Sequence, residues 1–61
     1  MSTEPDANAL FNIGRDYYSK KAYQEALKAW KAAQDQYQKE GKKRESGIVS
    51  SEIGKALLKI W

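Results

Sequence analysis

Cysteine and histidine are both absent from this chain of 61 residues, and proline occurs once, at Pro5. Without cysteine no disulfide can form, and without histidine the chain lacks the commonest metal ligand and general base. Nucleophilic pairs of serine or cysteine with histidine are therefore excluded, and the chain has no glycine-rich phosphate loop. We expect no catalytic, metal-binding or cofactor-binding residues, and hence no enzyme.

Long apolar runs are also missing. None approaches the roughly 20 residues that cross a bilayer, and residues 1–6 are polar and acidic, unlike a signal peptide. The 11 basic and 8 acidic side chains give a net charge of +3, and their signs alternate along most of the chain, which is typical of solvated helix surfaces. We therefore expect a cytoplasmic protein without a membrane partner.

The length limits the size of the hydrophobic core. A domain of this size buries only about 60% of the surface that its unfolded chain exposes, so the sequence predicts a single domain, residues 1–61, with a small core. Disulfides and metals cannot supplement that core, and oligomerisation is the usual remaining solution. Self-association is thus favoured before any motif is considered.

Three helices are predicted, at about residues 5–20, 23–40 and 43–60, so the expected fold class is all-α. The first begins near Pro5, whose fixed φ and missing N–H suit a first helical turn. The second ends before Gly41, because glycine readily adopts the left-handed conformation that closes a helix. Apolar residues recur at helical spacing in all three segments.

The third segment allows two other interpretations. The weak helix formers Ser46 and Gly47 are compatible with a later start, and the β-branched pair Ile48 and Val49 favours a strand. An apolar face that repeats over about four turns outweighs two residues of strand propensity. We therefore predict a helix that begins at about residue 43.

An Ile-Gly pair occurs twice, at Ile13-Gly14 and again at Ile53-Gly54. The first pair belongs to a set of residues whose sizes and spacing resemble the tetratricopeptide repeat, a helical hairpin that stacks into superhelical arrays. The resemblance implies one complete repeat plus the first helix of a second, acting as a protein interaction module. In such a hairpin, Gly14 and Ala26 let two antiparallel helices approach closely. The residues that carry the resemblance, and that we expect to pack the repeat, are Leu10, Ile13, Gly14, Tyr17, Tyr23, Ala26, Trp30 and Ala33.

The third predicted helix lacks the following helix that would cover it in a longer array. Its apolar stripe is then exposed, and such stripes usually mark an interface or an aggregation liability. We predict that the stripe is buried in a homodimer, the commonest symmetric assembly, with a domain-swapped form if an interhelix turn straightens. Two alternatives stay open, a fragment of a longer scaffold and a compact monomer that hides its own stripe. The predicted self-association residues are Ile53, Leu57, Ile60 and Trp61.

Tetratricopeptide repeats usually bind peptides in a concave groove lined by the first helix of each repeat. A basic and aromatic groove favours a peptide with acidic and apolar residues. The competing interpretation is that the aromatic residues are partly buried packing residues and that the cations only solvate the surface. The resemblance places Asn8, Phe11, Arg15, Tyr18, Lys55 and Lys59 in this groove.

The basic run at residues 39–44 suggests a different class of function, the binding of nucleic acid. The aromatic residues that could stack on bases are needed mainly for the core. Such binding is therefore predicted to be weak and steeply dependent on salt. A protein or peptide is the expected partner.

Overall fold

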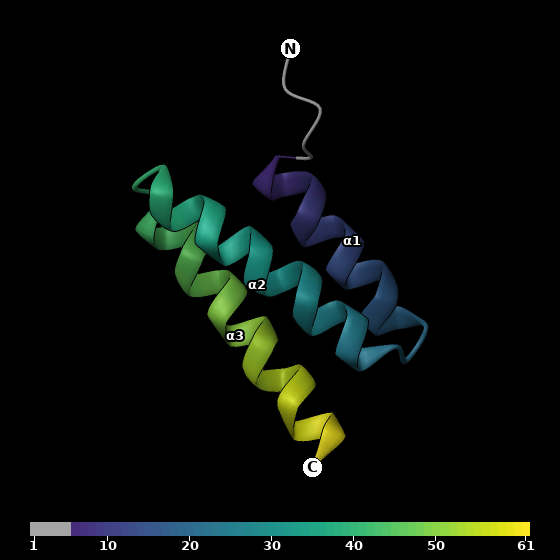
Figure 1. Cartoon of the computed structure of the whole chain (residues 1–61). Coiled ribbons are helices and arrows are strands. Elements are labelled where there is room, and N and C mark those ends of the chain that lie inside the picture. The colour runs from purple at the N-terminus through teal and green to yellow at the C-terminus, as the bar shows by residue number, and fades with distance from the viewer. Residues whose placement is uncertain (1–5) are drawn as a thin grey trace.

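The computed structural model describes residues 6–61, which form three α-helices joined by two tight turns (Figure 1). The helices are α1 at Ala7–Ser19, α2 at Tyr23–Lys39 and α3 at Lys43–Ile60. No strand occurs within the described residues, so the predicted all-α class is confirmed.

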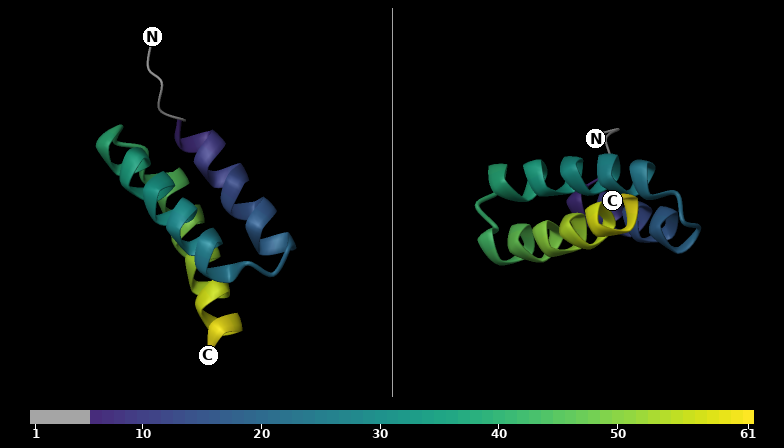
Figure 2. Two further views of the ribbon diagram at one scale, coloured as in Figure 1. Left: turned by 45° about the vertical axis from the view of Figure 1, so that its right-hand side comes forward. Right: turned by 90° about the horizontal axis from the view of Figure 1, so that it is seen from below.

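Helix α2 packs against both of the other helices (Figure 2). Consecutive helices run antiparallel, so α1 and α3 point in the same direction along α2. The Cα atoms extend over 36 × 23 × 12 Å, which describes a thin array. Because the array is thin, α1 and α3 each keep apolar side chains that no other part of residues 6–61 covers.

Helix α1 begins at Ala7 because Asp6 caps it. The Asp6 carboxylate accepts a hydrogen bond from the Ala9 backbone N–H at 2.8 Å, which satisfies one of the free donors of the first turn. The predicted start at about residue 5 is therefore too early. Pro5, on which that prediction rested, lies outside the described residues.

Helix α2 ends at Lys39, and the predicted glycine closes it two residues later. Gly41 has a φ of +74°, and its N–H donates to the Gln38 carbonyl at 3.1 Å. The next N–H, that of Lys42, donates to the Tyr37 carbonyl at 2.8 Å. These two bonds form a Schellman motif, which satisfies carbonyl groups in the last turn of the helix.

The turn between α1 and α2 repeats this geometry without a glycine. Lys21 has a φ of +65°, and the Ala22 N–H donates to the Tyr17 carbonyl at 2.9 Å. The left-handed conformation costs an L-residue roughly 1–2 kcal/mol. The hydrogen bonds of the turn and the packing of the two helices therefore hold Lys21 in a strained backbone conformation.

Helix α3 begins at Lys43, earlier than the alternative start near Ser46. Gly47 and the β-branched pair that follows it lie within the helix without interrupting it. Val49 is buried and Ile48 is exposed, as expected for neighbours that point to different sides of a helix.

The core is centred on Trp30 of α2, whose side chain is fully buried. Its indole lies against Gly14 of α1, where an added Cβ would overlap the ring. The indole Nε1–H donates to the Phe11 carbonyl at 3.1 Å, so Trp30 joins α1 to α2 by a hydrogen bond as well as by packing. The buried apolar residues are Ala7, Ala26, Trp30, Ala33, Tyr37, Val49 and Ala56.

Candidate interaction surface

Two of the residues predicted to pack the repeat are exposed instead. Ile13 is 41% exposed and Tyr17 is 37% exposed. Ile13 precedes Gly14 by one residue and is therefore turned by about 100° from the face that meets Trp30. The predicted packing is corrected at these two positions, because no described residue covers that flank of α1. The other six are buried or partly buried: Leu10, Gly14, Tyr23, Ala26, Trp30 and Ala33.

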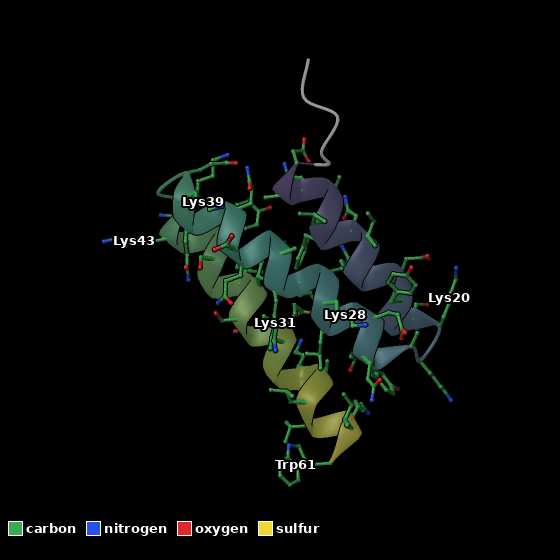
Figure 3. The ribbon with its side chains drawn as sticks, in the orientation of Figure 1. Lys20, Lys28, Lys31, Lys39, Lys43 and Trp61 are labelled. Carbon is green, nitrogen blue, oxygen red and sulfur yellow. The ribbon has the colours of Figure 1, made fainter. Side chains whose placement is uncertain are left out.

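The residues predicted for self-association do not form one continuous exposed stripe. Ile53 is partly buried against the core, which corrects its predicted exposure. Leu57 and Ile60 are exposed, and Trp61 is 96% exposed. The last turns of α3 extend beyond the other helices, and Trp61 points away from them (Figure 3). We refer to Leu57, Ile60 and Trp61 as the C-terminal stripe.

The aromatic residues of the predicted peptide groove pack inside the protein. Phe11 and Tyr18 are partly buried against the core, with ring centroids 6.4 and 5.6 Å from that of Trp30. Tyr18 also meets Tyr23 edge to face at 5.2 Å. Much of the flat apolar area that a peptide would use is therefore already occupied.

Two of the polar residues predicted for the peptide groove contact other side chains of the protein, and two are exposed to solvent. The Tyr37 hydroxyl donates to Asn8 Oδ1, and Lys55 Nζ lies 3.3 Å from the Glu52 carboxylate. The two remaining cations, Arg15 and Lys59, are exposed. No residue predicted for the peptide groove lines the hollow that the structure has between α2 and the first half of α3.

The basic run at residues 39–44 is partly neutralised by neighbouring carboxylates. Lys39 Nζ lies 3.4 Å from Asp35, and Lys42 Nζ lies 3.3 Å from Glu40. Exposed pairs of this kind stabilise the fold very little, but they lower the positive charge that a phosphate backbone would meet.

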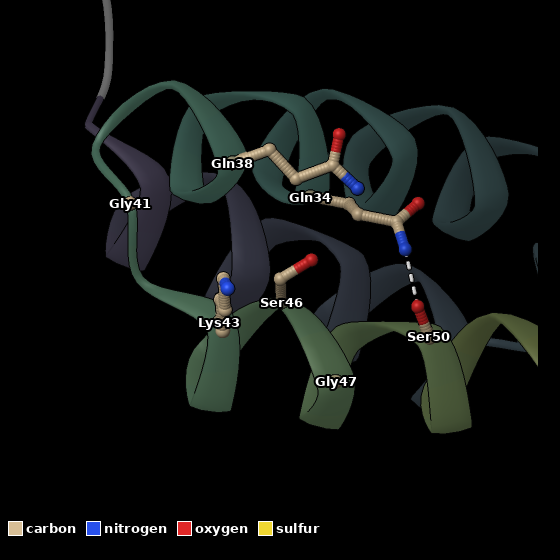
Figure 4. Close-up of a pocket in the computed structure, with 7 residues that line it drawn as sticks. All are labelled: Gln34, Gln38, Gly41, Lys43, Ser46, Gly47 and Ser50. Carbon is tan, nitrogen blue, oxygen red and sulfur yellow. Dashed lines mark hydrogen bonds between the residues drawn. The ribbon is translucent and has the colours of Figure 1, made fainter.

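One groove on the surface was not predicted from the sequence. It is a groove of about 440 Å³ between α2 and the first half of α3 (Figure 4). The Gln34 side-chain amide donates to the Ser50 hydroxyl and joins its two walls. The sequence signal for the groove is the run of small residues in the first half of α3. This α2–α3 groove is lined by Gln34, Gln38, Gly41, Lys43, Ser46, Gly47 and Ser50.

Within residues 6–61, no helix combines the length and the apolar character needed to cross a membrane. Comparison with protein-family models, with curated proteins and with solved structures gives no match. A functional assignment therefore rests on the surfaces of the chain itself. Those surfaces are the C-terminal stripe and the α2–α3 groove.

Proposed function

We propose that this chain is a non-enzymatic protein interaction module that associates with further copies of itself through the C-terminal stripe. The exposure of Trp61 beside Leu57 and Ile60, at the end of a helix that extends past its neighbours, carries the proposal. Contiguous exposed apolar side chains on a small domain are the usual mark of an interface. A dimer is the simplest closed assembly that buries them.

The small core gives a second reason for association. Trp30 and Val49 are the only large side chains among residues 6–61 that are fully buried. A domain of this size has little hydrophobic stabilisation to spare. Burying the C-terminal stripe against a partner adds apolar area that the monomer cannot supply.

The proposal includes the tetratricopeptide-like architecture. Its support is the close approach of Gly14 to Trp30, the antiparallel pairing of α1 with α2, and the second Ile-Gly pair on α3. In this architecture α3 is the first helix of a second repeat. Stacked repeats bury their apolar faces against neighbours, and the exposed apolar side chains of α3 are available for such a contact.

The proposal is tested by absolute mass from light scattering on a sizing column, over a hundredfold range of protein concentration. Far-UV circular dichroism of the same samples verifies that the chain stays helical. We expect a discrete dimer that dissociates on dilution. A helical monomer at every concentration would contradict the proposal and direct attention to the exposed cations Arg15 and Lys59.

A further inference from the structure

A regular seam runs along one face of α3 from the α2–α3 groove to two residues of the C-terminal stripe, Leu57 and the C-cap residue Trp61. Its residues are spaced alternately four and three positions apart, the heptad spacing with which two helices pack side by side. The seam consists of Lys43, Gly47, Ser50, Gly54, Leu57 and Trp61.

The two halves of the seam have opposite shapes. In the first half, Gly47 and Ser50 line the α2–α3 groove. A Cβ added at Gly47 or Gly54 would meet no heavy atom within 4 Å, so the space above these positions is open. In the second half, Leu57 is exposed, and Trp61, which follows the last residue of the helix, points away from the other helices.

Ser46 lines the groove and lies where it can contact an occupant. This residue is only 8% exposed, yet its hydroxyl points into the groove (Figure 4). A donor on an entering side chain, such as the indole N–H of a tryptophan, can hydrogen-bond to this hydroxyl.

We infer that the occupant of the α2–α3 groove is the C-terminal half of α3 from a second copy of this chain. The inference rests on the proposed self-association and specifies its geometry. Two α3 helices lie antiparallel about a two-fold axis near the middle of the seam. Leu57 of each copy then lies over Gly47 of the other, and Trp61 over Lys43.

The antiparallel arrangement matches large side chains to small ones at each end of the seam. It also places the Lys43 ammonium beside the Trp61 indole, which favours a cation–π contact. A parallel arrangement places Lys43 against Lys43 and leaves both grooves empty. Each contact, such as Leu57 of one copy with Gly47 of the other, occurs twice with the copies exchanged, as two-fold symmetry requires.

The area that this dimer buries is sufficient for a specific but weak interface. An aromatic side chain buries roughly 150–250 Å². Leu57 and the walls of the groove that receives it bury further area, and the second groove contributes the same amount by symmetry. The total area buried in the dimer is on the order of 1,000 Å², near the lower limit for specific interfaces. We therefore expect a dimer that dissociates on dilution.

Filling the groove tests the inference without disturbing the monomer. Gly47→Leu has room for its Cβ and replaces a weak helix former by a strong one. We expect this variant to stay helical and to raise the dimer dissociation constant at least tenfold. Asn12→Leu, at an exposed position of α1, is the matched control and should leave the dissociation constant unchanged.

Cysteine cross-linking reports the register directly, because the sequence contains no thiol. The variants are Gly47→Cys and Leu57→Cys, oxidised separately and as an equimolar mixture. In the antiparallel dimer, equivalent positions 47 lie ten residues apart along the helix axis, about 15 Å. A disulfide spans Cα atoms no more than about 7 Å apart. We expect cross-linked dimers in the mixture and none from either variant alone.

The outcomes separate this inference from the proposed function. Self-cross-linking of either variant alone would show a parallel pair and overturn the inference. Two results together would also overturn the inference while leaving self-association standing. The Gly47→Leu variant would remain a dimer like the wild type, and the mixture of the two cysteine variants would give no cross-link. A wild-type chain that is monomeric throughout the concentration series would overturn both.

Discussion

Gly14 of α1 and Trp30 of α2 are in such close contact that no side chain fits at position 14. The indole occupies the place where a Cβ would lie, and its Nε1–H is fixed by the Phe11 carbonyl. The ring therefore has little freedom to move aside. The separation of α1 and α2 is set by this contact.

Gly14→Ala is expected to lower the free energy of unfolding by about 2 kcal/mol or more, because overpacking displaces the indole or the helix. The loss should appear although alanine is the better helix former by about 1 kcal/mol. Urea unfolding followed by circular dichroism measures this loss of stability.

The control for Gly14→Ala is Gly54→Ala, compared at a concentration where the chain is monomeric. It should be stabilising, since its Cβ meets open space. Equal stabilities of the two variants would show that the indole does not restrict position 14.

Lys21→Gly is expected to raise the free energy of unfolding by up to about 1 kcal/mol. Glycine removes the strain of the left-handed conformation, and part of the gain is lost to the greater freedom of the unfolded chain. Thermal unfolding of the variant and the parent provides the comparison. The reciprocal change Gly41→Ala, in the equivalent turn, should destabilise the protein. A destabilised Lys21→Gly variant would contradict this account of the turn.

Leu57→Glu is expected to disrupt self-association and to retain the helical content of the chain. A carboxylate at this position would have to be buried in the dimer interface without a charged partner. Ile48→Glu is the matched control, since Ile48 is also an exposed apolar residue of α3 but lies off the seam. Light scattering should give a monomer for the first variant and a dimer for the second. An unchanged mass for Leu57→Glu would remove the C-terminal stripe from the interface.

A labelled single-stranded oligonucleotide is expected to bind only weakly at physiological salt. The basic run at residues 39–44 is partly paired with carboxylates, and the exposed aromatic residues Tyr17 and Trp61 lie near the far ends of α1 and α3, away from this run. Fluorescence anisotropy at low and physiological salt measures the affinity and its salt dependence. Submicromolar binding that persists at physiological salt would favour nucleic acid over protein as the partner.

Local signals in the sequence were sufficient to predict the three helices. Glycine closes a helix in the left-handed conformation without strain, and the φ of Gly41 is positive as expected. The first turn could not be predicted in the same detail, because lysine carries no signal for a positive φ. The same hydrogen-bonded turn closes α1 with Lys21 in the strained position.

The surfaces were harder to predict than the helices. Periodicity shows which side of α3 is apolar, but it does not show which apolar residues α2 covers. Ile53 and Ala56 are covered, whereas Leu57, next to Ala56, is exposed. The α2–α3 groove depends on how two helices lie relative to each other, which no single-helix pattern specifies. Its small residues, such as Gly47, are visible in the sequence only as weak helix formers.

Helix α2 is the one element against which both other helices pack extensively, and this divides the stability of the fold into two parts. Helix α3 is anchored mainly through Val49 and Ala56, whereas the Trp30 hydrogen bond belongs to the α1–α2 hairpin. Undocking of α3 is therefore a local opening that leaves this hairpin bond in place. The α2–α3 groove exists only while α3 is docked. The apparent affinity of any partner for the groove consequently scales with the docked fraction, which couples recognition to local stability.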